Sequence, residues 1–398
     1  MSGFIEKAED ALRDVAKDYS PPGSTVEAVI DQWLHAIASG SDLFAANRGI
    51  DEKSVIRELK RAGLYESKAT FSRNLYDNIH LKPPVKHAFR FIDLFAGIGG
   101  IRLGFQMNGG TCVFSSEYDK NAQATYKNNY GETPFGDITE IDPVEIPDHD
   151  ILLAGFPCQP FSHAGVSARN SRGSKHGFEC KTQGTLFFDI MRIALEKRPK
   201  VLFLENVRNI ERHDKGNTFE TIKESIKEIG YDFKHAIINS STLVPQKRVR
   251  CYMVCFRSDL KKEFEFPDFE GLPLPLSSVL EEQVDDKFTI SDRLWLGHIN
   301  RTKRNIARGT GFTAHTADLS KPSNTIVARY GKDGKECLIP QEGKNPRLLT
   351  PRECARLQGF PENFLFPSAK TPAYKQFGNS VAVPVIEKIA ATIIEGGL

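Results

Sequence analysis

Six short apolar runs, separated by stretches with helical periodicity, most limit the fold of this 398-residue chain. Consecutive apolar residues over strand-like lengths are typical of strands buried on both faces of a sheet. Such strands in alternation with amphipathic helices predict an α/β fold with a mostly parallel sheet. The runs cover residues 89–95, 111–115, 151–154, 201–204, 234–238 and 250–256.

The pattern divides the chain into four parts, since 398 residues exceed one ordinary core. Residues 1–85 are expected to form a separate helical module. Residues 86–262 carry the sheet, 263–345 form a smaller, β-rich domain, and 346–398 return to the sheet domain. No internal repeat is evident.

The helical module contains a helix, a turn at Gly63 and a second helix, the outline of a helix-turn-helix. In that interpretation Lys68, Arg73 and Asn74 face DNA. A helical bundle used for packing or dimerisation explains the same pattern.

Composition narrows the class of protein. The chain is 40% apolar and 26% charged, and its formal net charge of +2 requires any nucleic-acid surface to be local. The seven cysteines show no metal-site spacing, and Cys251 and Cys255 alternate with apolar residues as in a buried strand. No apolar stretch approaches the about 18 residues of a membrane span. We expect a reduced, soluble, cytoplasmic protein without a metal.

A glycine turn follows the first predicted strand, in Phe-Ile-Asp-Leu-Phe-Ala-Gly-Ile-Gly-Gly at 91–100. Glycines let the backbone approach a ligand at a helix start. Glu117 ends the second strand, where a carboxylate accepts hydrogen bonds from both hydroxyls of a ribose. The pattern lacks the third glycine of a dinucleotide site and the lysine of a phosphate loop. It favours S-adenosyl-L-methionine, with a dinucleotide site or a structural turn as alternatives.

Cys158 follows the third predicted strand, in Gly-Phe-Pro-Cys-Gln-Pro at 155–160. Ligands bind at this edge of open α/β sheets, so a thiol held there is placed to act as a nucleophile. An inert core cysteine is the alternative. Glu205 ends the fourth strand near the same edge, where burial can keep it protonated. A solvent-exposed carboxylate at a strand end would show the same pattern.

Two arginines precede the last predicted strand. Arg248 and Arg250 alternate with Val249, so we expect both on one face of an extended segment, near anions or polar acceptors. A surface salt-bridge pair is the alternative.

With these residues in place, the chain resembles the bacterial DNA (cytosine-5) methyltransferases, in their Dcm-like subgroup. Seven sequence blocks occur in the family's order and cover roughly residues 89–258 and 346–398. The resemblance implies a Rossmann-like, S-adenosylmethionine-dependent methyltransferase sheet and a target-recognition domain at 263–345. The blocks are residues 93–100, 155–159, 184–188, 205–207, 245–250, 349–361 and 376–381.

The resemblance also implies a mechanism. The target cytosine leaves the duplex, because its ring is unreachable inside the stack. Cys158 attacks C6 as a thiolate, protonated Glu205 bonds N3, and Arg250 lies near O2. C5 then takes a methyl group and loses a proton, for which a water is a plausible acceptor.

Other roles follow from the resemblance alone. The cofactor pocket is expected to contain Phe95, Ala96, Gly97, Gly99, Glu117, Tyr118, Asp137, Ile138, Pro157, Leu186, Asn379 and Ser380. A long loop at 162–183, with Arg169, Arg172, Lys175 and Lys181, is expected to close over DNA phosphates, although a flexible surface loop is the alternative.

The 263–345 range is expected to bind duplex DNA. Within residues 291–310, positively charged residues outnumber acidic ones, which suits neutralisation of a phosphate backbone. The single acid is Asp292, and the cations are Arg293, Arg301, Lys303, Arg304 and Arg308. Residues 325–334, which include Arg329, Tyr330 and Lys332, resemble a stretch of enzymes that read CC–GG sites with a variable centre.

The expected partner is double-stranded DNA, bound by a monomer, with a dimer through residues 1–85 as an alternative. A cognate restriction endonuclease would be a functional partner of a restriction-modification system. Two other functions stay open: a tRNA cytosine-5 methyltransferase, and a DNA-binding regulator with an inactive catalytic domain. Intact Cys158, Glu205 and Arg250 argue against the regulator.

Overall fold

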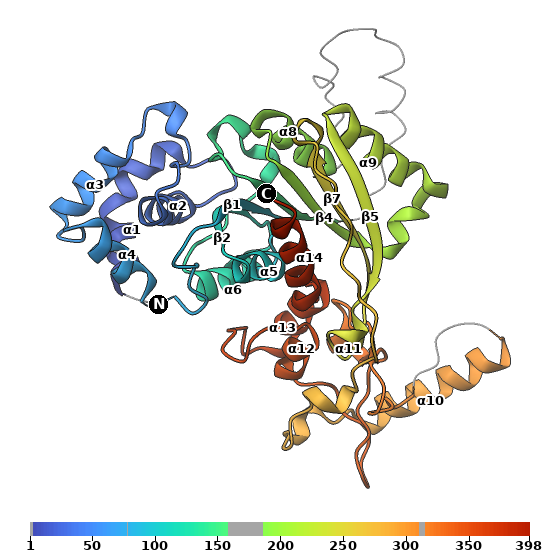
Figure 1. The fold of residues 1–398 in the computed structure, drawn as a ribbon. Helices are drawn as coiled ribbons and strands as arrows, with labels where there is room; N and C mark the ends of the chain where they lie inside the picture. Colours follow the sequence, from blue (N-terminus) through green and yellow to red (C-terminus); the bar gives the residue numbers. More distant parts are fainter. Residues whose placement is uncertain (1–2, 78, 158–185, 310–314) are drawn as a thin grey trace. The chain divides into compact units, whose positions relative to one another are not determined.

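A six-stranded sheet organises the computed structural model, which describes residues 3–77, 79–157, 186–309 and 315–398 (Figure 1). The strand order is β2-β1-β3-β4-β7-β5. β1 pairs in parallel with β2 and β3, β3 pairs in parallel with β4, and β4 pairs antiparallel with β7. The strands are β1 (Phe89–Leu94), β2 (Gly110–Ser116), β3 (Ile151–Gly155), β4 (Val201–Val207), β5 (Tyr231–Asn239) and β7 (Val249–Arg257). The expected α/β fold with a mostly parallel sheet is confirmed.

The register of the parallel strands sets where their carboxyl ends meet. Leu94 lies opposite Ser116 on one side and Ala154 on the other, and Gly155 lies opposite Glu205. The polar residues that follow these strands therefore start from one edge of the sheet. β1 to β4 are almost entirely buried, which explains their continuous apolar sequence.

The chain divides into two compact units. The first comprises Met1–Ile237, Arg250–Phe266 and Ala390–Leu398; the second comprises Ile238–Val249 and Pro267–Ile389. Helices of the first unit are α1 (Gly3–Ala16), α2 (Val26–Ser39), α3 (Glu52–Arg61), α4 (Lys68–Tyr76), α5 (Gly100–Met107), α6 (Lys120–Tyr130), α8 (Leu186–Lys197) and α9 (Asn217–Glu228).

The N-terminal helices share a core with the sheet, which corrects the expectation of a separate module. Every residue of α2 from Ala28 to Ala38 is buried, as in a helix surrounded on all sides. The Gln32 Nε2 donates to the Val113 carbonyl of β2 at 3.1 Å. The Phe44 ring packs against Phe135 with ring centroids 4.4 Å apart. Sequence periodicity shows which positions are apolar, but not that a helix has two covered sides.

The helix-turn-helix outline is present in α3 and α4. Asp51 and Ser67 cap the two helices, and Gly63 has a φ of 71° in the turn between them. Both helices bury apolar residues, including Val55 and Phe71, in the same core. Their binding to DNA stays a prediction.

A buried ionic cluster joins the N-terminal helices to α6. The Lys127 Nζ lies 2.5 Å from the Glu9 Oε1 and 3.2 Å from the Asp31 Oδ2. The Asp31 Oδ2 also accepts a hydrogen bond from the Thr133 N–H at 2.8 Å. Two carboxylates thus share one lysine in a buried place, and burial raises the pKa of Asp31 to about 7.

The second unit has little regular sheet. β6 (Gln246–Lys247) pairs in parallel with β8 (Ser323–Asn324). Within the described part of 263–345, which we expected to be β-rich, isolated bridges accompany β8, and more residues are helical than extended. Helices that begin in this unit are α10 (Asp292–Ala307), α11 (Tyr330–Asp333), α12 (Pro351–Leu357), α13 (Lys370–Asn379) and α14 (Val383–Glu395).

One stretch of the described chain, Lys370–Glu395, is long and apolar enough to cross a membrane by composition. Of its most apolar window, 61% is buried inside the protein, as in a core helix. A break at 380–382 separates it into α13 and α14.

We predict that Asp31 makes stability depend on pH. The unfolded carboxyl, with a pKa near 3.8, is ionised at pH 5, whereas the folded one still holds its proton, so folding takes up a proton. The free energy of unfolding should therefore fall as the pH rises from about 5 to about 8, and Asp31→Asn should flatten this slope. Urea denaturation across this pH range measures both slopes; equal slopes would contradict the assignment.

Candidate active site

The turn between β1 and α5 has strained backbone. Phe95 has a φ of 55°, in the left-handed region that residues with a side chain rarely adopt, and Gly97 follows with a φ of 56°. Such strain costs about 1–3 kcal/mol and concentrates at functional sites. The Ala96 N–H donates to the Ser116 carbonyl at 3.0 Å, which holds the turn against the end of β2.

Glu117, directly after β2, is oriented by backbone groups. Its Oε2 accepts a hydrogen bond from the Gly97 N–H at 2.7 Å, and its Oε1 accepts one from the Asp119 N–H at 2.7 Å. Burial raises the pKa of this carboxyl, and the N–H donors act in the opposite direction. The structure thus brings Glu117 and the glycine turn together.

The glycines of the turn differ in what surrounds them. A Cβ on Gly97 would meet nothing within 4 Å, so this side of the turn is open. A Cβ on Gly99 would lie 2.3 Å from the Tyr130 Cε2, and the Tyr130 hydroxyl donates to the Gly99 carbonyl at 2.8 Å. Gly97 therefore suits close approach by a ligand, whereas Gly99 permits packing against α6.

Three other predicted cofactor residues lie near the end of β2. The Glu117 N–H donates to the Phe135 carbonyl at 2.8 Å, which places residues 135–138 beside Glu117. Asp137 caps its own turn through the Thr139 N–H at 3.0 Å, and Ile138 is buried. The side chain of Tyr118 is 77% exposed, so it presents an uncovered aromatic face next to the carboxylate.

Asn206 connects β4 to the segment that leads to Cys158. Its Nδ2 donates to the Phe156 carbonyl at 2.9 Å, and its Oδ1 accepts the Val207 N–H at 2.8 Å. Asn206 is 2% exposed, and Phe156 is buried against Phe187. This side chain was not among the predicted site residues, although its place between Glu205 and Val207 at a strand end was a usable signal.

Glu205 and Arg250 form an ion pair. The Arg250 Nε lies 3.2 Å from the Glu205 Oε1, and the two side chains are 13% and 11% exposed. The Glu205 Oε2 lies 3.6 Å from the position of a Cβ on Gly155, so the carboxylate covers the end of β3. The protonation of Glu205 that we expected from its burial stays a prediction; the structure shows only that a guanidinium lies beside this carboxyl group.

Arg248 does not share the environment of Arg250. It is 3% exposed, and its guanidinium donates to the carbonyls of Ile326 and Gly378, both at 3.1 Å, and to that of Ser380. Gln246 accepts the Ile326 N–H at 2.9 Å on the same segment. These bonds hold the turn after α13, where Asn379 and Ser380 lie. Alternation along a strand indicated one face for both arginines, but β6 and β7 belong to different sheets and Arg248 lies in neither strand.

The described residues leave several predictions untested. Cys158, Arg169, Arg172, Lys175 and Lys181 lie outside them. Pro157 is exposed and Leu186 is partly buried at the start of α8. Asn379 and Ser380 belong to the second unit, so their place in the cofactor pocket stays a prediction. In the described part of the chain, no three His, Cys, Asp or Glu side chains gather into a metal site.

Among the residues predicted to contact DNA, Tyr330 is fully buried. Its hydroxyl donates to the Cys337 carbonyl at 2.6 Å and accepts the Leu349 N–H at 2.8 Å, so it is a core residue and cannot face DNA. Arg301, Lys303, Arg304, Arg329 and Lys332 are exposed.

Comparison with known proteins identifies the class to which this fold and site belong. The family model of C-5 cytosine-specific DNA methylases matches residues 89–395. The chain therefore belongs to this family and is a DNA (cytosine-5) methyltransferase that uses S-adenosyl-L-methionine.

Individual relatives agree with this assignment. The chain is 52% identical to the Type II methyltransferase M1.ScrFI of Lactococcus lactis subsp. cremoris, over 77% of this chain and 78% of that protein. It is 39% identical to the DNA-cytosine methyltransferase of Escherichia coli K12, over 94% of this chain and 93% of that protein. This second alignment extends into the N-terminal helices. A solved structure of Spodoptera frugiperda DNMT2 has a similar fold, with a TM-score of 0.60 and 21% identity, over 77% of this chain and all of that one.

We predict that Asn206→Ala lowers kcat by about 10- to 100-fold, because it frees the Phe156 carbonyl and lets the segment that carries Cys158 move. The KM for S-adenosyl-L-methionine should stay within about 2-fold, since Asn206 is remote from the Glu117 turn in the sheet order. Steady-state methyl transfer measures both constants. The matched control is Asn209→Ala, an exposed asparagine just after β4. Equal kcat values for the two variants would contradict the role of Asn206.

We predict that Arg248→Lys weakens binding of the cofactor but does not slow the chemical step. Lysine retains the charge but cannot span three carbonyls, so the turn at 378–380 should loosen and the melting temperature should fall. We expect the KM for S-adenosyl-L-methionine to rise about 10-fold with kcat within about 2-fold. A fall in kcat at saturating cofactor, with an unchanged KM, would instead support the catalytic role first predicted for Arg248.

Proposed function

We propose that this enzyme flips a cytosine out of a specific duplex site and methylates its C5 through a covalent adduct with Cys158. The observation that best supports the proposal is the hydrogen bond from Asn206 to the Phe156 carbonyl. It fixes the chain two residues before Cys158 and immediately beside the Glu205–Arg250 pair. A nucleophile and the two groups that stabilise charge on a pyrimidine ring would then start from neighbouring strands.

Cofactor binding is proposed to centre on Glu117. Its two oxygens accept one backbone N–H each, which leaves further lone pairs for the hydroxyls of a ribose. The open side of Gly97 permits close approach, and the exposed ring of Tyr118 offers a surface for a flat base. These residues fit S-adenosyl-L-methionine, which supplies an electrophilic methyl group when bound.

Covalent chemistry is proposed to begin when the Cys158 thiolate attacks C6, which forms the S–C6 bond and moves an electron pair toward C5 and N3. Arg250 faces O2, and Glu205 donates a proton to N3, so charge does not accumulate on the ring. Glu205 Oε1 and Arg250 Nε already lie 3.2 Å apart in the structure, so both groups would meet the same ring. After C5 gains its methyl group, Glu205 takes back the N3 proton, a water takes the C5 proton, and the electrons expel Cys158.

The biological setting is proposed from the relatives. Several similar proteins are named Type II methyltransferases, which suggests a restriction-modification system with a cognate endonuclease as a functional partner. We further propose a CC–GG target with a variable centre, from residues 325–334, and a cytoplasmic monomer acting on duplex DNA. Cations at Arg169 and Arg172 would contact its phosphates.

Bisulfite sequencing tests the proposal. A plasmid from a host without cytosine methylation of its own, expressing this chain, should show protected cytosines at one recurring sequence. Cys158→Ala should abolish protection, because no adduct can form. Arg250→Lys should reduce the rate at least about 10-fold, because lysine lacks the forked guanidinium.

Two outcomes would overturn parts of this proposal. Protection that persists in Cys158→Ala would exclude the adduct. Soluble wild-type protein that protects no plasmid cytosine but methylates tRNA would shift the substrate to RNA.

A further inference from the structure

The buried and partly buried residues of helix α10 lie along one side of it. His298 is its only fully buried residue, and the His298 Nε2 lies 2.8 Å from the Asp333 carbonyl oxygen of α11. The Arg301 Nη1 lies 3.5 Å from the Asp333 Oδ2, and Ser291 caps the helix through the Leu294 N–H. These contacts restrict rotation of the helix about its own axis, so they determine which of its residues face outward. Figure 1 shows α10 as one continuous helix.

The outward side of α10 carries a regular row of polar residues. Arg293, Gly297, Asn300 and Arg304 are all exposed and recur at spacings of four, three and four, so they lie along one line of the helix. With a rise of 1.5 Å per residue, Arg293 and Arg304 stand about 16 Å apart. This exceeds the about 12 Å width of the major groove, so Arg293 and Arg308, near the two ends of the helix, can reach both of its phosphate walls.

Positive charge on this side is uncompensated. Arg293, Lys303, Arg304 and Arg308 are exposed, and none of them has an ion-pair partner among the residues that the structure describes. The single acid of the helix, Asp292, already accepts a hydrogen bond from the Asn345 Nδ2 at 2.6 Å. Four unpaired cations on one helix repel each other unless an anion lies against them, and a polyanion with regular spacing is the best match.

An apolar partner fits this side less well. Leu296 and Ile306 are 58% and 67% exposed, but they are ten residues apart and point in directions about 80° different on a helix of 3.6 residues per turn. They therefore do not form one continuous patch. The row between the two arginines contains Gly297, which lets another surface approach the helix axis, and Asn300, whose amide pairs with the donor and acceptor edge of adenine.

We propose that the outward side of α10 enters the major groove of the target duplex, with Asn300 and Arg304 toward base edges and Arg293, Lys303 and Arg308 on phosphates. This inference rests on the proposed function, in which duplex DNA is the substrate. It assigns to one helix both the reading of bases and the neutralisation of the backbone. Residues outside α10 would complete the recognition.

Binding of the full-length protein to two duplexes tests the inference. One duplex carries the sequence that the wild-type protein methylates, and the other is a random sequence of equal length. Lys303→Ala with Arg308→Ala should weaken binding to both duplexes and reduce the slope of log K against log salt by about 2. Asn300→Ala should weaken binding to the target by about 10-fold and to the random duplex by less than about 2-fold.

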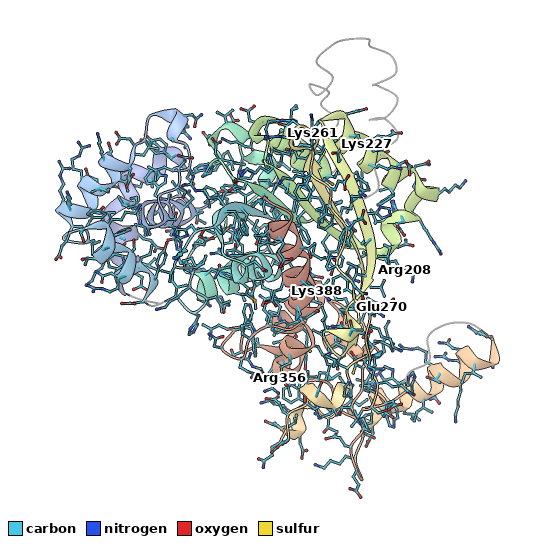
Figure 2. All side chains as sticks on the ribbon, in the orientation of Figure 1. Arg208, Lys227, Lys261, Glu270, Arg356 and Lys388 are labelled. Carbon is cyan, nitrogen blue, oxygen red and sulfur yellow. The ribbon has the colours of Figure 1, made fainter. Side chains whose placement is uncertain are left out.

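The matched control is Lys227→Ala, an exposed lysine of α9 that is labelled in Figure 2. All of these substitutions are at exposed positions, so melting temperatures should match the wild type. If the wild type methylates duplex DNA while the α10 variants behave as Lys227→Ala does, the role of α10 is wrong and the proposed function stands. If the wild type binds and methylates no duplex, the proposed function fails and this inference falls with it.

Discussion

The parallel pairing of β1 to β4 is the constraint on which the candidate site depends. Parallel strands end at a common edge, and the register places the ends of β2, β1, β3 and β4 next to one another. Each end is then fixed by a side chain bonded to neighbouring backbone: Glu117 to Gly97, and Asn206 to Phe156. The strand register and these hydrogen bonds together position the loops at this edge of the sheet. Phe95, in one of these loops, has a strained backbone conformation.

The N-terminal helices show how a segment outside the matched family region becomes part of the fold. Gln32 bonds to β2, and Phe44 fills the space between α2 and the sheet. Because α2 is buried on every side, its removal would expose one face of the sheet core. Glu9, Asp31 and Lys127 form an ionic cluster between these helices and α6. The stability of this association therefore depends on the protonation of Asp31.

Arg248 and Arg250 show that the position of a residue in a sequence motif does not determine its partners in the folded protein. Two residues apart and chemically identical, they have different partners: Arg250 pairs with a carboxylate, and Arg248 binds three backbone carbonyls. Sequence spacing predicted one face for both, since a strand was assumed to be continuous. Arg248 lies between β6 and β7, which belong to different sheets, so the two arginines are not on one continuous strand.

The sequence by itself determined the strands, the glycine turn, Glu117, Glu205 and the family, because apolar runs and short motifs are local properties of the chain. Only the tertiary structure decided that the first 85 residues share the core, that Tyr330 is buried, that Arg248 holds backbone, and that Asn206 fixes the segment before Cys158. Each of these depends on a partner distant in sequence. A pattern along one segment cannot specify what packs against it.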